Sequence, residues 1–311
     1  MRSLETKELS NSLKLVFVVQ CHKVTNTLEF MISKLNLVKN VTVFIHVDDK
    51  SNINDFLHYE SDNVRLIKDR INVSWGGFSQ ILLYVNALKL IENVDFDYVS
   101  FISGDDFLLQ DIEVFRHFLN ENKGKEFIGI QNVHSDFFES RYKILHPSFM
   151  FKRDLNYKNR IYRKVFSLVT NMGFLKNNRK VPYLNFYKGS NWFTISKYTS
   201  SFISLHLKNR KEILDYFSES YCCDEIFFQT IIMNEPSIKH KVYKYEYTWM
   251  DDNIKSLRYI DWKSGPDFPR VFSRKNLLDV NIPKIYFFCR KIDPSLSVKE
   301  LSDLFDQINE D

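Results

Sequence analysis

The first 120 residues alternate short apolar runs with longer amphipathic segments, and this alternation is the strongest constraint on the fold. Apolar runs that predict buried strands stand at 14–20, 41–47, 64–68 and 98–102. Segments with helical periodicity stand at 26–37, 78–92 and 112–120. Strand–helix alternation of this kind is typical of a mostly parallel sheet with helices on both faces. The sequence therefore predicts an α/β fold.

The predicted strands are followed by polar or aromatic residues. Those nearest the strand ends are His22, Asp48, Trp75 and the pair Asp105-Asp106. In a parallel sheet the carboxyl ends of the strands share one edge, and ligands bind in the crevice beyond it. We therefore expect a binding site along this edge.

Composition narrows the class of protein. The net charge of +4 (43 basic and 39 acidic residues among 311) is too small to indicate a nucleic-acid partner, whereas an anionic small substrate fits. The four cysteines (Cys21, Cys222, Cys223 and Cys289) have neither the number nor the spacing of a disulfide scaffold or zinc site. No apolar run reaches the roughly twenty residues of a membrane span, and residues 1–14 are charged. We expect a cytoplasmic protein.

The stretch 222–229 is the most informative one for chemistry. The acidic pair Asp224-Glu225 is predicted to open an apolar helix, between the small and aromatic residues of 188–193 and the basic segment 258–262. Asp224 can cap that helix, with Glu225 at its positive end. A rigidly held carboxylate can equally act as a general base. The residues alone leave both interpretations open.

In sites for anionic small substrates, a metal ion on an Asp-x-Asp triplet often neutralises the negative charge. The triplet 95–97 precedes the strand at 98–102, so it stands at the wrong end of that strand for a ligand site. Asp105-Asp106 follows the strand but lacks the spacing. Basic side chains can do the same electrostatic work. We therefore expect no metal ligands and no cofactor.

Several motifs together resemble one known family. They are Ile45-His46-Val47-Asp48, Ser74-Trp75-Gly76-Gly77, Phe101 to Phe107, Gly189 to Phe193, Asp224-Glu225, Arg258 to Trp262 and Phe288 to Asp293. Their order and spacing, from about Leu15 to Asp293, resemble the core-2/I-branching β-1,6-N-acetylglucosaminyltransferases, a family that includes the peptide O-xylosyltransferases. The chain is similar to a short, bacterial-type member. It departs from the pattern at Leu108, where proline is usual.

The resemblance implies a glycosyltransferase A-type fold, Rossmann-like, in a single domain over 1–311. Residues 15–130 would form the nucleotide-binding half, 131–293 the acceptor and catalytic half, and 294–311 a C-terminal helix. It also implies an inverting mechanism that needs no metal and uses a UDP-sugar, with Glu225 as catalytic base.

The same resemblance assigns binding residues. Donor-binding residues would be Val19, His22, Asp48, Trp75, Gly76, Asp106, Arg270 and Lys291, the last two on the diphosphate. Neighbours that are alternatives for the diphosphate are Arg274, Lys275 and Arg290. Asp106 either binds the donor sugar or supports its turn, and Trp192 either stacks on a sugar or lies in the core. Apart from the resemblance, Glu139, Arg141 and Tyr142 lie in a polar loop predicted after a strand at 127–131, where they would contact the acceptor.

The stretch 150–182 is basic and rich in predicted loop. It is either a solvated helix and loop, or a lid that faces the acceptor or a membrane. The second interpretation predicts peripheral contact with the inner face of the plasma membrane.

The predicted function is transfer of a sugar, with N-acetylglucosamine favoured, from a UDP-sugar to a hydroxyl of a glycan or lipid-linked saccharide. Synthesis of a surface polysaccharide would use such an enzyme. Transfer from UDP-xylose to a serine hydroxyl is the alternative within the family. A sugar-nucleotide-binding pseudoenzyme and a protein that binds polyanions through 150–182 are alternatives of other classes.

Overall fold

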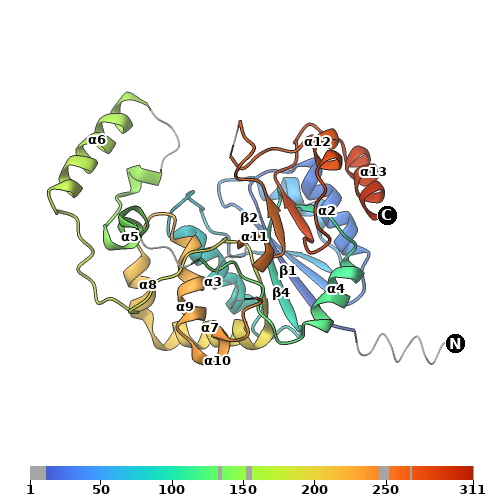
Figure 1. The fold of residues 1–311 in the computed structure, drawn as a ribbon, viewed down its shortest axis with the longest axis horizontal. Helices are drawn as coiled ribbons and strands as arrows, with labels where there is room; N and C mark the ends of the chain where they lie inside the picture. Colours follow the sequence, from blue (N-terminus) through green and yellow to red (C-terminus); the bar gives the residue numbers. More distant parts are fainter. Residues whose placement is uncertain (1–11, 132–134, 152–155, 245–251, 267, 311) are drawn as a thin grey trace.

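The computed structural model describes residues 12–131, 135–151, 156–244, 252–266 and 268–310. Its central sheet has five strands in the order β3-β2-β1-β4-β6 (Figure 1). The strands are β1 (Leu15–Cys21), β2 (Val41–Val47), β3 (Val64–Leu66), β4 (Tyr98–Ser103) and β6 (Thr194–Ser196). The first four run parallel, and β6 is antiparallel to β4. The predicted α/β fold with a mostly parallel sheet is confirmed.

The helices predicted between these strands are present and divide between the two faces of the sheet. They are α2 (Asn26–Asn36), α3 (Ser79–Leu90) and α4 (Ile112–Glu121). Alternate residues of β1 point to opposite faces. Phe17 packs with α2 and α4 in one hydrophobic cluster, and Val18 packs with α3 in the other. The sheet is therefore the middle layer of three, as Figure 1 shows.

The other helices and 3-10 turns of the described ranges are mostly short. They are η1 (Ile53–Tyr59), α5 (Asp136–Lys143), η2 (Ser148–Phe151), α6 (Tyr157–Asn171), α7 (Lys197–Asn209), α8 (Lys211–Phe217), η3 (Cys223–Glu225), α9 (Phe227–Met233), α10 (Pro236–Lys239), α11 (Asp252–Lys255), α12 (Arg274–Asp279) and α13 (Val298–Asn309). Within the described ranges, no helix has the length and apolar character needed to cross a membrane.

Two predictions of secondary structure need correction. The strand predicted over 127–131 is absent from this described segment, which makes only isolated bridges from Phe127 to Thr194 and from Gln131 to Lys188. The C-terminal helix begins at Val298, later than predicted, because Ser297 forms a capping box with Glu300.

A second sheet joins the end of β4 to the C-terminal part of the chain. It has the order β5-β8-β7, with β5 at Phe107–Leu108, β8 at Phe288–Arg290 and β7 at Arg258–Ile260. Its pairing places two arginines against the turn that follows β4. Arg258 Nη1 lies 2.7 Å from Asp106 Oδ2, and Arg290 Nη1 lies 3.2 Å from Asp106 Oδ1. Distant motifs therefore meet at the carboxyl end of the central sheet.

Two glycines let the segments that carry the catalytic half approach closely. A Cβ atom on Gly189 would lie 1.8 Å from the backbone oxygen of Gly129. No side chain fits at that distance, and the obstacle is backbone rather than a flexible side chain. The amide of Gly189 also donates to the carbonyl of Glu225 at 2.9 Å.

We expect Gly189→Ala to lower the free energy of unfolding by about 3 kcal/mol or more, because the two backbones must separate. Gly124→Ala is the matched control, since Gly124 has φ +83° but open space around its Cβ position. The control should cost only about 1 kcal/mol, the cost of the left-handed conformation. Urea titration of both variants measures the difference, and equal losses would contradict the close contact.

Candidate active site

The predicted base, Glu225, lies at the end of η3, a short 3-10 turn before α9. The prediction that the acidic pair opens the apolar helix is wrong in detail, because α9 begins after Ile226 and has no side-chain cap. Asp224 is buried instead, and its Oδ2 accepts a hydrogen bond from Asn191 Nδ2 at 3.0 Å. The side chain of Glu225 is 33% exposed. The two carboxylates therefore have different environments.

Two cations face Glu225. Arg141 Nη1 donates to Glu225 Oε2 at 2.8 Å, and Lys188 Nζ lies 3.8 Å from the same oxygen. Both cations therefore lie against one oxygen of the carboxylate.

Asp224 differs because it is buried. Burial, reinforced by the negative charge of Glu225, raises the pKa of the Asp224 carboxyl. Glu225 is therefore the member of the pair that is both exposed and surrounded by cations.

The tryptophan-containing turn at 75–77 holds the turn that carries Glu225 in place. Cys222, in the left-handed region at φ 48°, donates its amide to the carbonyl of Gly76 at 2.7 Å. A Cβ atom on Gly76 would lie 2.9 Å from Cys222 Sγ. Trp75 is half exposed and packs edge-on against Tyr221, 6.3 Å between ring centroids. The structure thus places Trp75 and Gly76 beside the base.

The predicted acceptor residues fall in different places. Arg141 and Glu139 lie on α5, so the prediction of a loop there is wrong. Arg141 reaches Glu225, whereas Glu139 pairs with Lys143 on its own helix. The sequence reasoning missed Lys188 as a site residue. The signal for it was its position next to the motif glycine, Gly189.

Trp192 lies in the core rather than at an open sugar-binding face. Its ring is 7% exposed, packs edge-on with Tyr84 and has the Arg290 guanidinium 4.7 Å above it. This corrects the interpretation of Trp192 as a stacking residue, because a buried ring offers no free face. Asp106 is also fully buried, and besides its two arginines it accepts from the Ser103 amide at 3.0 Å. Its carboxylate supports the turn.

The residues predicted for the nucleoside lie at the ends of β1 and β2. Asp48 is largely buried, and its carboxylate accepts from the amide and the Nζ of Lys50, both at 3.0 Å. His22 is exposed, and its carbonyl accepts from Ser51 Oγ at 2.5 Å. Val19 is completely buried in the core. A side-chain contact from Val19 to a ligand is therefore inconsistent with the packing.

The two residues predicted for the diphosphate are joined through their backbones. The Lys291 amide donates to the Arg270 carbonyl at 3.4 Å, and Arg270 Nη1 lies 3.8 Å from Asp261 Oδ2. The alternative residue Arg274 contacts α13 instead, donating to Gln307 Oε1 at 3.2 Å. Arg290 is drawn toward Asp105 and Asp106.

The acidic residues before β4 are engaged in ion pairs and hydrogen bonds rather than gathered as metal ligands. Lys14 pairs with Asp95, and its amide donates to Asp97 at 2.8 Å, so the 95–97 triplet lies at the amino end of β4 as predicted. Across the described part of the chain, no three histidine, cysteine or acidic side chains gather as a metal site. Independence from metal stays a prediction.

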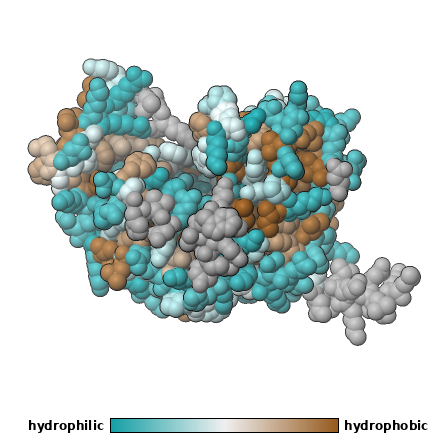
Figure 2. Space-filling view, in the orientation of Figure 1, coloured by the Kyte–Doolittle hydropathy of each residue, from teal (hydrophilic) through white to brown (hydrophobic). Residues whose placement is uncertain are grey.

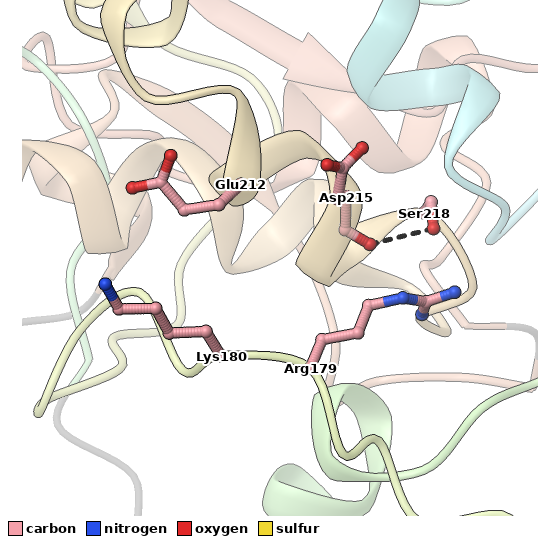
Figure 3. Close-up of a pocket in the computed structure, with 5 residues that line it drawn as sticks. All are labelled: Arg179, Lys180, Glu212, Asp215 and Ser218. Carbon is pink, nitrogen blue, oxygen red and sulfur yellow. Dashed lines mark hydrogen bonds between the residues drawn. The ribbon is translucent and has the colours of Figure 1, made fainter.

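A surface pocket of about 460 Å³ lies away from these residues (Figure 3). Arg179 and Lys180 face α8 across it, and the other lining residues are Glu212, Asp215 and Ser218. Both signs of charge line the pocket, and it includes none of the predicted site residues.

The fold and the site together define a class of enzyme. A mostly parallel α/β sheet, together with a partly exposed carboxylate between two cations, is consistent with a glycosyltransferase A-like fold. Residues 17–285 match the model of the core-2/I-branching enzyme family. The chain belongs to this family of glycosyltransferases.

Curated relatives are xylosyltransferases at low identity. Xylosyltransferase oxt of Drosophila pseudoobscura pseudoobscura is 22% identical, over 84% of this chain and 29% of that protein. Xylosyltransferase sqv-6 of Caenorhabditis elegans is 22% identical, over 94% and 36%. Xylosyltransferase 2 of Rattus norvegicus is 25% identical, over 84% and 30%. The chain spans about a third of the length of these relatives.

The raised pKa of Asp224 predicts a pH-dependent stability. Between the ordinary pKa of about 3.9 and the raised value, the folded state binds more protons than the unfolded state. The stability that Asp224 contributes is therefore present at low pH and lost as pH rises through the folded pKa. Asp224→Asn removes this titration.

The variant should become more stable relative to the native protein on going from about pH 4.5 to about pH 8, by about 1 kcal/mol or more. Urea titration at both values measures this change. A variant that loses stability relative to the native protein at the higher pH would show that the fold favours the ionised form.

Proposed function

We propose that this chain is an inverting glycosyltransferase that uses a UDP-sugar, with N-acetylglucosamine favoured, and needs no metal ion. The acceptor would be a hydroxyl of a glycan or lipid-linked saccharide, in cytoplasmic synthesis of a surface polysaccharide. One observation carries the proposal: Glu225 is a partly exposed carboxylate with Arg141 2.8 Å and Lys188 3.8 Å from the same oxygen.

The chemistry requires one base and one means of stabilising the leaving group. Glu225 would take the proton from the acceptor hydroxyl as its oxygen forms a bond to the anomeric carbon. The bond from that carbon to the diphosphate breaks on the opposite face, and UDP leaves with the electron pair. Arg270 and Lys291 would bind the diphosphate charge.

The ion pairs made by the acidic residues after β4 support independence from metal. Asp106 is fully paired with Arg258 and Arg290, and Arg290 also lies 3.8 Å from Asp105. Two guanidinium groups thus neutralise the two carboxylates that follow the strand. A divalent ion there would have to displace or face these cations.

Transfer from UDP-xylose to a serine hydroxyl is the second candidate. The names of the curated relatives favour it. Their low identity and the difference in length leave the donor open, so a panel of UDP-sugars is needed. A sugar-nucleotide-binding pseudoenzyme would bind UDP without turnover.

With EDTA present, the native chain should release UDP from one donor of the panel, and Glu225→Gln should reduce this rate by about 10²–10⁴-fold. Glu121→Gln is the matched control, because Glu121 is an exposed carboxylate at the end of α4 that pairs with His117 and is none of the predicted site residues. UDP affinity should stay within about twofold of the native value in both variants, since a base acts on the acceptor proton.

Loss of activity with EDTA and recovery with a divalent ion would overturn metal independence. UDP binding without turnover on any donor and acceptor tested would favour the pseudoenzyme.

A separate test addresses the diphosphate site. Arg270→Gln should weaken UDP binding about tenfold, because a charge-assisted contact to the diphosphate is lost. Arg274→Gln removes the same charge from a residue that contacts α13, and it should leave UDP affinity nearly unchanged. Isothermal titration with UDP compares the two. The reverse ranking would assign the diphosphate to Arg274.

A further inference from the structure

Helix α6 carries an apolar stripe that no described part of the protein covers. The exposed side chains recur every third or fourth residue, at Tyr157, Ile161, Val165, Leu168 and Met172. Helical geometry places such residues on one face. In Figure 1, α6 stands out from the body beside α5, and Figure 2 shows brown, hydrophobic side chains over this region.

The opposite face of α6 is the one that packs on the protein. Asn159 is buried, and the Phe166 ring lies 5.5 Å from the ring of His146. Tyr162 packs on Phe149 of η2, 5.6 Å between ring centroids. The helix is therefore anchored on one side, and its apolar stripe faces outward.

Cations border the stripe. Lys158, Arg160 and Lys164 are exposed, and with 3.6 residues per turn they fall on both sides of it. The wider sequence reinforces this pattern, since it has no Asp or Glu between Asp154 and Glu212. That interval holds twelve basic residues, Lys158, Arg160, Arg163, Lys164, Lys176, Arg179, Lys180, Lys188, Lys197, Lys208, Arg210 and Lys211.

An apolar stripe bordered by cations fits the boundary between lipid headgroups and acyl chains. A protein partner would need an apolar surface flanked by acidic residues to match the stripe and its cations. An anionic lipid bilayer offers acyl chains and negative headgroups in one surface. We propose that α6 binds the protein to an anionic lipid bilayer, with the apolar stripe at the acyl boundary and the basic residues in contact with lipid phosphates.

A series of direct contacts links α6 to Glu225. His146, which packs on Phe166 of α6, stacks on Tyr221 with 5.5 Å between ring centroids. The Tyr221 amide donates to the carbonyl of Arg141 at 2.8 Å, and Arg141 pairs with Glu225. Bilayer binding through α6 would bring Glu225 to a saccharide held on a lipid. This last consequence, which names the acceptor class, rests on the proposed function.

The test is flotation of the full chain, without donor, on phosphatidylcholine vesicles with and without phosphatidylglycerol. We expect binding only to the anionic vesicles, weakened by salt. The double substitution Ile161→Glu and Leu168→Glu should lower the partition constant for anionic vesicles about tenfold or more, because two apolar side chains are lost from the acyl boundary.

The control is Val114→Glu with Leu205→Glu, on α4 and α7, away from α6 in Figure 1. These residues match the test pair in exposure (47% and 59% against 41% and 64%). Both double variants change the net charge equally, from +4 by 2 to +2. The control should bind as the native chain does.

Several outcomes would overturn the inference: no binding to anionic vesicles, equal binding to neutral ones, or equal loss in both double variants. Sedimentation that shows α6 holding two copies together, or binding of a short RNA in place of vesicles, would do so as well. UDP affinity and UDP release, measured without vesicles, report separately on the proposed function. If the chain turns over donor but does not float, only the proposal of bilayer binding is wrong. If it floats but does not bind UDP, only the proposed transferase function is wrong.

Discussion

The buried cluster of Asp106, Arg258 and Arg290 is the interaction on which the site depends. It joins the turn after β4 to both basic strands of the second sheet, across a separation of about half the chain. Arg258 is 1% exposed and also donates to the Phe101 carbonyl at 2.8 Å. Removing one partner of such a cluster leaves a buried charge unpaired, at a cost of about 3–5 kcal/mol. The cluster therefore determines where the C-terminal cations lie relative to the sheet.

Most of the central sheet was predictable because its strands are local patterns. Val41–Val47 is apolar along nearly its whole length, as a strand buried on both faces must be, and the structure has β2 with those bounds. The segment 127–131 looks similar in sequence but lies against Thr194 and Lys188 through single bridges. Its conformation is set by partners more than fifty residues away, which periodicity cannot reveal.

The site was predictable only in part, for the same reason. Motif resemblance located Glu225 and the turn at 75–77, and the structure brings them together through Gly76 and Cys222. The partners of Glu225 come from α5 and from the residue before Gly189, so neither Arg141 nor Lys188 could be assigned to it by spacing. Trp192 shows a second limit of sequence reasoning, because a tryptophan in a motif can equally well be a core residue, and this one is buried.

The cations around Glu225 occupy the oxygen that would receive the proton in the proposed mechanism. Arg141 and Lys188 both contact Glu225 Oε2. In that mechanism an acceptor hydroxyl has to displace or share the contact with Arg141, whose backbone is tied to Tyr221. Tyr221 packs on His146, and His146 packs on α6. One chain of contacts therefore joins the outward-facing helix α6 to Arg141, the residue that pairs with Glu225.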